Sequence, residues 1–187
     1  MTDTRTRSVA LRGYRIAAAI GAEAYALGLG PPAPSLQGDG SDQLTYDQVV
    51  DDDELRRTTR KLFLDGHYAM AVEEACKCLN NLVKDLTGLD ALDGAGLMKK
   101  AFSRDNPVLR LNALGSRSEK AQQQGYMEIF SGVMTGVRNP RAHEHAYPDD
   151  PVTALELLTL ANHLIRTARV AASYSTHLIG LSGSPRI

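Results

Sequence analysis

The stretch LFLDGHYAMAVEEACKCLNNLV, residues 62–83, decides the fold of this chain of 187 residues. Beyond its Asp-Gly break, apolar residues recur from Tyr68 to Leu86 at alternating spacings of four and three, and charged residues fill the gaps. A stripe of apolar side chains at this spacing is typical of an amphipathic helix. The sequence therefore predicts a helix over roughly 68–86, preceded by a turn and an earlier helix.

Three further helices are indicated by their start signals. An acidic cluster beginning at Asp51 favours a helix N-terminus. Ser116 with Glu119 three residues later forms a capping-box pattern. Asp150 and Pro151 supply an N-cap and a first-turn proline for a last helix that reaches to about residue 172.

The remaining segments contain little strand signal. A short helix is predicted over 96–103, and VLRLNAL (108–114) is predicted to be an ordered loop, with a brief strand pairing as the alternative. The predicted fold class is all-α, an antiparallel bundle of four to five helices with an N-terminal helical arm. The domain boundaries predicted from composition are residues 1–29 for the arm, 30–45 for a flexible Pro/Gly linker, 46–174 for the helical domain and 175–187 for a C-terminal tail.

Charge is balanced over the whole chain but not locally. The formal net charge of −1 argues against a surface that grips nucleic acid generally, because that mode needs a large basic excess. Residues 39–54 are acidic, whereas residues 99–120 hold six bases against two acids. The basic stretch indicates either a site for a polyanion or a solvated face.

Neither membrane nor disulfide chemistry is indicated. No apolar run reaches the length of a membrane span. Cys76 and Cys78 stand two residues apart on a predicted helix, so they suit neither a disulfide nor a metal clamp and are expected to be small buried apolar residues. We expect a cytoplasmic protein without membrane contact, whose basic, Ala-rich start is a helix rather than a targeting peptide.

The stretch RNPRAHEH, residues 138–145, concentrates hydrogen-bonding and titratable groups. Pro140 lacks an amide hydrogen and pushes Asn139 out of the helical region, which predicts a bend that swings Arg138 and His143 toward one cleft. A guanidinium suits a phosphate, and an imidazole exchanges a proton near neutral pH. With Asn139 placed to orient either group, metal-free cleavage of RNA is possible in principle.

Two other roles for this stretch stay open. In the first, Arg138 and His143 are a capping arginine and a hydrogen-bonded histidine at a helix kink. In the second, they belong to a zinc site, although no established spacing joins the ligands. Its ligands would be His143, Glu144, His145 and either His163 or Asp149.

A family resemblance favours RNA cleavage over these two other roles. RNPRAH, residues 138–143, matches the Rx(4–6)H signature, and the chain resembles the Ymh-like branch of the HEPN superfamily of helical nucleotide-binding domains. The stretches 62–83 and GLMKKAFS at 96–103 stand in the order that this branch shows, and the likeness covers roughly residues 51–172. It implies an all-α domain, commonly a homodimer, whose two motifs line a cleft across the two-fold axis.

The resemblance also implies the activity of a metal-independent endoribonuclease in toxin–antitoxin, abortive-infection or other antiphage systems. It assigns phosphate binding to Arg138, acid or base work to His143 and the polar position to Asn139. RNA is the expected substrate, with an antitoxin or defence protein as a further partner and without cofactor or metal. Further substrate contacts are predicted at Arg141, His145, Ser131, Glu74 and Lys77. The alternative is a non-catalytic module that binds nucleotide, RNA or a partner protein.

Glycines indicate how the chain associates. Gly125, Gly132 and Gly136 lie inside the helix predicted before the motif, although each costs roughly 1 kcal/mol relative to Ala in a helix interior. Close approach of another helix backbone would offset that cost. The last helix, over 151–172, also has a broad apolar face. Together these features predict a homodimer.

Overall fold

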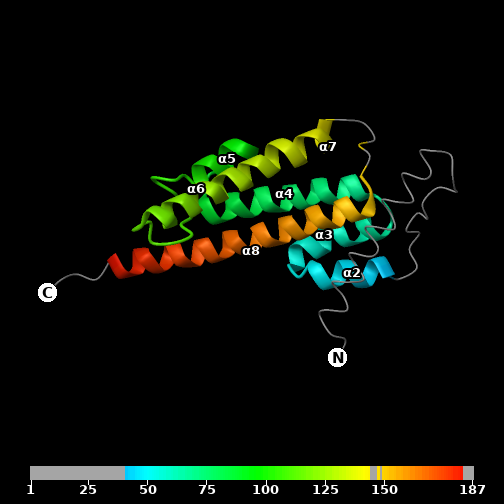
Figure 1. Cartoon of the computed structure of the whole chain (residues 1–187), viewed down its shortest axis with the longest axis horizontal. Helices are drawn as coiled ribbons and strands as arrows, with labels where there is room; N and C mark the ends of the chain where they lie inside the picture. The colour runs from blue at the N-terminus through cyan, green and yellow to red at the C-terminus, as the bar shows by residue number, and fades with distance from the viewer. Residues whose placement is uncertain (1–40, 144–146, 148, 183–187) are drawn as a thin grey trace, which may run out of the picture. The chain divides into compact units, whose positions relative to one another are not determined.

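The computed structural model describes residues 41–143, 147 and 149–182, and every regular element in that part of the chain is helical (Figure 1). The predicted all-α class is confirmed. The predicted arm, residues 1–29, lies outside the described residues. The elements are α2 (Ser41–Val49), α3 (Asp53–Leu64), α4 (Tyr68–Thr87), α5 (Gly94–Ala101), α6 (Arg117–Gly132), the π-helical turn η1 (Val133–Arg138), α7 (Asn139–His143) and α8 (Pro151–Ser182).

The helix ends lie where local signals predict them. Asp52 caps α3 by accepting a hydrogen bond from the backbone N–H of Leu55 at 3.1 Å. The capping box of α6 is complete, because the Ser116 hydroxyl and the Glu119 carboxylate each accept from the other's backbone N–H, at 3.1 and 2.8 Å. α4 ends at Gly88, whose φ of +68° is a left-handed conformation that glycine adopts without strain.

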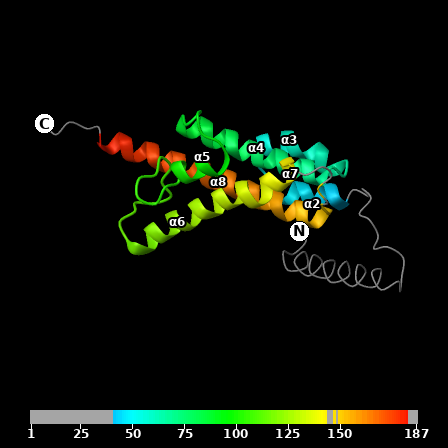
Figure 2. The ribbon, with the colours of Figure 1, turned by 90° about the horizontal axis from the view of Figure 1, so that it is seen from above.

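Helix α4 is central to the bundle. It packs against α3 and α8, while α5 packs against α6, and Figures 1 and 2 show α4 beside α8 from two directions. Cys78 and Ile165 line one hollow of this interface and Leu86 and Ala172 the next, so α4 and α8 run in the same direction. Helix α6 runs in the opposite direction between them (Figure 1), so α4, α6 and α8 alternate in direction along the chain, which is compatible with the predicted antiparallel bundle.

The core is built from the predicted apolar stripes. Leu158 and Leu164 of α8 are fully buried, and the rings of Phe102 and Phe130 stack with centroids 4.0 Å apart. One buried polar side chain, that of Asn162, joins α8 to the junction of α2 and α3. Its oxygen accepts from the backbone N–H groups of Asp51 and Asp52 at 3.2 and 3.1 Å. Hydrogen bonding of this kind satisfies a buried amide and fixes the start of α3.

Two helices extend beyond the predicted boundaries. α2 begins at Ser41, inside the predicted linker 30–45, because Tyr46 belongs to the core and its hydroxyl bonds the Thr59 hydroxyl at 2.6 Å. α8 continues to Ser182, through much of the predicted tail 175–187. Its late turns are supported by the segment 102–116, since Ser175 accepts from a backbone N–H of that segment at 2.9 Å. That segment is an ordered loop without a strand, as predicted.

Helix α8 has 32 residues, a length of about 48 Å. Its exposed side is mostly polar apart from Val170, and Arg166 and Arg169 pair with the acidic start of α3. Of the helices in the described part of the chain, none combines the length and the apolar character needed to cross a bilayer.

Candidate functional site

A π-helical turn stands where the sequence predicts a kink. In η1 the backbone N–H of Asn139 donates to the oxygen of Met134, five residues earlier, and Asn139 keeps helical dihedral angles, φ −62° and ψ −44°. The prediction that Asn139 leaves the helical region is therefore wrong, and the disturbance expected before Pro140 takes the form of the π-helical turn. A π-helical turn contains an extra residue. The wider turn accommodates the ring of Pro140, and the helix continues through His143.

Arg141 is buried and fully engaged inside the protein. Its Nε and Nη2 donate to the two carboxylate oxygens of Asp149 at 2.5 and 2.6 Å, and Nη1 donates to the oxygen of Val137 at 2.8 Å. The guanidinium carbon also lies 4.6 Å from the ring centroid of Tyr147. Only 5% of the Arg141 side chain and 2% of the Asp149 side chain are exposed. Arg141, predicted as a substrate contact, thus fixes α7 to the segment that leads into α8.

Arg138 has a more open environment. It is half-buried, its Nη1 donates to Oδ1 of Asn139 at 3.3 Å, and no carboxylate of the described residues lies within 4 Å of it. Asn139 is therefore in contact with the guanidinium that it was predicted to orient. Arg138 lies close to the start of α5, where hydrogen bonds from Lys84 and Asn80 hold the pKa of Asp93 below its usual range and the Arg138 charge adds to this effect.

His143 is exposed at the end of α7, and none of the described residues forms a hydrogen bond with its imidazole. On an α-helical path, five residues turn through about 140° around the axis. The side chains of Arg138 and His143 therefore diverge. Two residues turn through about 200°, so His143 projects nearly opposite to the buried Arg141. One chain by itself does not bring Arg138 and His143 onto the same helix face.

Two predicted contacts on α4 lie on another side of that helix. Glu74 and Lys77 line a hollow of about 410 Å³ bounded by α3, α4 and α8, which includes no residue of the motif. Nζ of Lys77 bridges the carboxylates of Glu73 and Glu74 at 2.9 and 2.8 Å. These contacts satisfy Lys77 within its own helix. The structure thus does not bring Glu74 and Lys77 together with Arg138 and His143.

The two remaining predicted contacts are placed as follows. Ser131 is 7% exposed, and its hydroxyl donates to the backbone oxygen of Glu128 at 3.2 Å, within its own helix. η1 lies between Ser131 and Arg138 and changes the register on which their common face was predicted. His145 lies outside the described residues.

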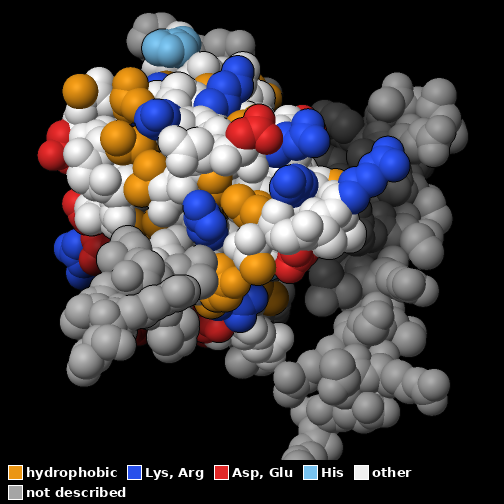
Figure 3. Space-filling view, turned by 90° about the vertical axis from the view of Figure 1, so that its left-hand side faces the viewer, with side chains coloured by type: hydrophobic (Ala, Val, Ile, Leu, Met, Phe, Trp, Pro, Cys, Tyr) orange, Lys and Arg blue, Asp and Glu red, His pale blue; other side chains and the backbone are white. Residues whose placement is uncertain are grey.

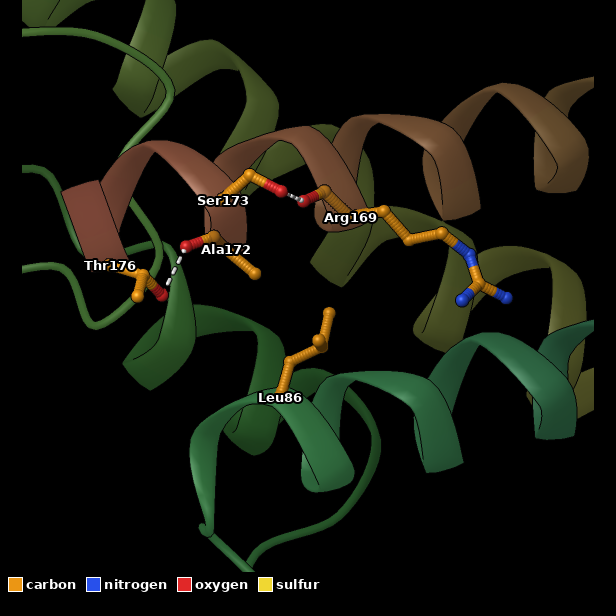
Figure 4. Close-up of a pocket in the computed structure, with 5 residues that line it drawn as sticks. All are labelled: Leu86, Arg169, Ala172, Ser173 and Thr176. Carbon is orange, nitrogen blue, oxygen red and sulfur yellow. Dashed lines mark hydrogen bonds between the residues drawn. The ribbon is translucent and has the colours of Figure 1, made fainter.

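A second hollow, of about 590 Å³, lies beside α8 (Figure 4). Figure 4 shows the hydroxyls of Ser173 and Thr176 turned to their own helix, where they donate to the backbone oxygens of Arg169 and Ala172 at 3.1 and 3.0 Å. The Arg169 guanidinium is directed to Asp52, at 2.9 Å. The polar groups of this hollow are therefore satisfied within the protein.

The alternative metal site gains no support from its more distant ligands. Nε2 of His163 is 3.0 Å from the Tyr126 hydroxyl, and Asp149 belongs to the ion pair with Arg141. Glu144 and His145 lie outside the described residues. Within the part of the chain that the structure describes, no three His, Cys, Asp or Glu side chains are grouped to hold a metal ion.

The thiol near the motif is chemically inert. Burial raises the pKa of Cys76 to about 12, although the nearby charges of Arg141 and Arg138 act in the opposite direction. A thiol with such a pKa stays protonated at neutral pH, so Cys76 is not a nucleophile. Cys76 is buried as predicted, whereas Cys78, for which burial was also predicted, is partly exposed.

Two residues that shape the site were missed by sequence reasoning. Asp149 and Tyr147 hold Arg141, and therefore decide which arginine of the motif is free. An opposite charge eight residues after Arg141 was the available signal. It had no predictive value alone, because the pairing depends on the course of the loop before α8.

A family model matches residues 51–168, from just before α3 to the middle of α8, and the whole RNPRAH motif falls inside this range. The chain belongs to the Hypoth_ymh family. This is a family of proteins of unknown function. The Hypoth_ymh match agrees with the Ymh-like part of the sequence resemblance, and the wider HEPN resemblance stays a prediction. No curated protein and no solved structure matches the chain.

Proposed function

We propose that this Hypoth_ymh protein is a metal-independent endoribonuclease of the HEPN type that acts as a toxin or antiphage effector. Arg138 holds the scissile phosphate, His143 exchanges the proton, and Asn139 orients the guanidinium. One observation carries the proposal. Of the two arginines in the motif, Arg141 is committed to a buried ion pair, whereas Arg138 and His143 stay accessible and without a carboxylate partner among the described residues.

The chemistry uses only these groups. A neutral imidazole removes the proton of a ribose 2′-hydroxyl, and the resulting oxygen attacks the adjacent phosphorus. The bond to the 5′-oxygen breaks, the His143 imidazolium formed in the first step returns its proton to that oxygen, and the products are a 2′,3′-cyclic phosphate and a free 5′-hydroxyl. The Arg138 guanidinium stabilises the negative charge that builds up on the phosphate oxygens.

Two copies of the chain are part of the proposal. Because Arg138 and His143 diverge by about 140° on one helix, Arg138 of one copy acts with His143 of the other. The glycines of α6 and η1 support this arrangement. Gly125 and Gly132, with the exposed Ile129, follow spacings of one face of α6, and Gly136 lies in η1. Among the described residues, a Cβ added at any of these glycines meets no atom within 4 Å, so we propose that a second copy covers them.

The first test is cleavage of RNA in EDTA, with the product ends identified. Wild type is expected to leave 2′,3′-cyclic phosphate and 5′-hydroxyl ends, and His143→Ala is expected to lower the rate by roughly 10²–10⁴-fold at unchanged helicity. Expression of the wild type, but not of His143→Ala, is expected to arrest growth. Cleavage by His143→Ala at the wild-type rate contradicts the proposal.

A mixing experiment tests the division of labour between copies. Arg138→Ala and His143→Ala are each expected to be inactive, yet a mixed dimer contains one Arg138 and one His143 on opposite copies. Random mixing is expected to restore roughly a quarter of the wild-type rate, since half of the dimers have one complete site of two. No recovery in a verified mixed dimer means that the two side chains act within one chain.

The second candidate function is a non-catalytic module that binds nucleotide, RNA or a partner protein. It is favoured by the divergence of Arg138 and His143 within the single chain. The same RNA assay separates the two functions. A wild-type dimer that binds RNA or a partner and leaves every RNA intact supports the module.

A further inference from the structure

One end of the helical domain is basic. Figure 3 shows this end, where Lys and Arg side chains are spread over the exposed surface. We call this set of side chains the basic end. It consists of Lys99 and Lys100 in the last turn of α5, Arg104 and Arg110 in the segment 102–116, and Arg117 and Lys120 in the first turns of α6.

The charges of the basic end lack carboxylate partners. All six side chains are exposed or, for Arg110, half-buried. Of these six side chains, only that of Arg104 has an ion pair within the described part of the chain, to Asp105 at 3.9 Å, a long separation between two exposed groups. Glu119, the other nearby acid, accepts instead from the backbone N–H groups of Gly115 and Ser116 at 2.9 and 2.8 Å. The local net charge of +4 over residues 99–120 is therefore not neutralised within the described residues.

The acidic stretch at the start of the domain is different. Each of four carboxylates there pairs with an arginine at 3.3 Å or less. These carboxylates are Asp47, Asp51, Asp52 and Glu54. The fold thus pairs four acids of residues 39–54 with arginines but leaves the bases of residues 99–120 available for a ligand.

The backbone under these charges is rigidly held. Gln123 is fully buried, and its side chain donates to the backbone oxygens of Phe102 and Leu109 at 3.1 and 3.0 Å and accepts from the N–H of Leu111 at 3.0 Å. Leu114 has a φ of +57°, a conformation that L-residues other than Gly, Asn and Asp seldom adopt. Strain of this kind persists only where the surroundings enforce it. The segment is therefore a preformed platform whose side chains are free while its backbone is fixed.

Two basic residues lie where the helix dipole is unfavourable for a positive charge. Arg117 and Lys120 lie in the first turns of α6, where the positive end of the helix dipole disfavours cations. Lys99 and Lys100, in the last turn of α5, have the favourable position, so helix stability alone accounts for them. Arg117 and Lys120 have no such explanation and point to an external anion.

Helix α5 joins the basic end to the proposed catalytic site. η1 packs against α5, and the charge of Arg138 helps to lower the pKa of Asp93, the N-cap residue of α5. Lys99 and Lys100 stand at the other end of α5, whose eight residues span about 12 Å. A strand held by Arg138 therefore reaches the basic end along α5 within a few nucleotides.

We propose that the basic end binds the sugar–phosphate backbone of single-stranded RNA on one side of the bond that the Arg138–His143 site cleaves. This inference rests on the proposed function for its substrate, but binding is measured independently of cleavage. Backbone contacts of this kind give affinity that is independent of sequence and depends on salt. They also reconcile a net charge of −1 for the chain with a polyanionic substrate.

The test uses the full chain with His143→Ala, so that the RNA stays intact during the measurement. In this background, binding of a fluorescein-labelled single-stranded RNA of about 16 nucleotides is followed by anisotropy over a range of salt concentrations. The test variant removes three exposed charges of the basic end, Lys99→Gln, Arg104→Gln and Arg117→Gln. The control removes three exposed charges elsewhere, Arg57→Gln, Lys61→Gln and Arg166→Gln, and changes the net charge equally.

The test variant is expected to bind on the order of 100-fold more weakly at about 0.1 M salt, and its slope of log K against log salt is expected to fall by about 2. The control is expected to change affinity less than about threefold. Equal losses in both triple variants, or an unchanged slope in the test variant, overturn the proposal. Failure of the parent protein, His143→Ala, to bind the RNA also overturns the proposal. If the parent binds as expected and the active wild type cleaves nothing, the nuclease proposal fails while the RNA-binding surface stands.

Discussion

Two arginines three residues apart, Arg141 and Arg138, have opposite environments. Arg141 is enclosed by Asp149, Tyr147 and a backbone oxygen, and every donor group that it directs inward is used. Among the described residues, the Arg138 side chain donates one long hydrogen bond, to the residue beside it. The difference teaches how the motif divides its work. One guanidinium holds the end of the helix through a buried ion pair, and the other is free to meet a ligand.

The π-helical turn makes this division possible. Pro140 would disrupt an α-helical turn, but η1 absorbs the extra residue and delivers a continuous helix to His143. Arg141, which donates to Asp149, lies within this continued helix.

Removal of the buried arginine, Arg141, is expected to have the largest effect on stability. Arg141→Ala leaves the Asp149 carboxylate buried without a partner, and should lower the free energy of unfolding by about 3–5 kcal/mol. Urea unfolding at fixed protein concentration measures this change. As the matched control, Arg138→Ala is expected to change it by less than about 1 kcal/mol. Equal losses for the two variants would remove the distinction between the arginines.

The proposed contact between two copies at the glycines is tested by adding a methyl group there. Gly132→Ala should stabilise a single chain by about 1 kcal/mol, because alanine is the better helix former and no atom lies within 4 Å of the added Cβ. The same methyl group should weaken association of two copies. Light scattering over a range of concentrations measures the association, and urea unfolding at a concentration where the chain is single measures the stability. Association that is unchanged in Gly132→Ala places the interface elsewhere.

The partly exposed ion pair of Asp47 with Arg60 and Arg56 is expected to have the smallest effect on stability, and this effect depends on pH. The Arg60 guanidinium, with help from Arg56, holds the pKa of Asp47 well below its usual range. A carboxyl with a lowered pKa contributes stability that is complete above its unfolded pKa of about 3.9 and is lost as the pH falls through the folded value. The side chains are a quarter to a third exposed, so Asp47→Asn should cost only about 1 kcal/mol at neutral pH.

The pH profile of unfolding checks this prediction. The difference between wild type and Asp47→Asn should be constant above about pH 5 and should shrink below about pH 4. A difference that persists at acid pH indicates that Asp47 acts through packing. Comparison with Arg141→Ala then shows how much a partly exposed and a buried arginine–aspartate pair each contribute to the free energy of unfolding in one protein.

Local chemistry explains what the sequence predicted well. The apolar stripe of α4, the Ser116 capping box and the Asp150 N-cap each depend on residues within one or two turns, and all three are present. The late turns of α8 depend instead on a distant partner, since Ser175 accepts a hydrogen bond from the backbone of Arg110. Such contacts leave no periodic pattern in the sequence. For that reason the predicted boundary was too early.

The candidate site shows the same limit at the scale of single residues. The motif named Arg138, Asn139 and His143 from their chemistry, and the contact between Arg138 and Asn139 is present. Arg141 was predicted to contact the substrate, as Arg138 was, because the sequence does not show whether a guanidinium is buried or exposed. The partner that separates them, Asp149, is chosen by the loop before α8, which spacing alone does not determine.

The most direct test of this account is the rate of RNA cleavage by Arg138→Ala, measured together with its urea unfolding midpoint. The account predicts that cleavage falls by roughly 10²–10³-fold, as for the loss of one donor to a developing anion, while the midpoint stays at the wild-type value. A variant that cleaves at the wild-type rate, with its fold intact, contradicts the assignment of Arg138 to the phosphate.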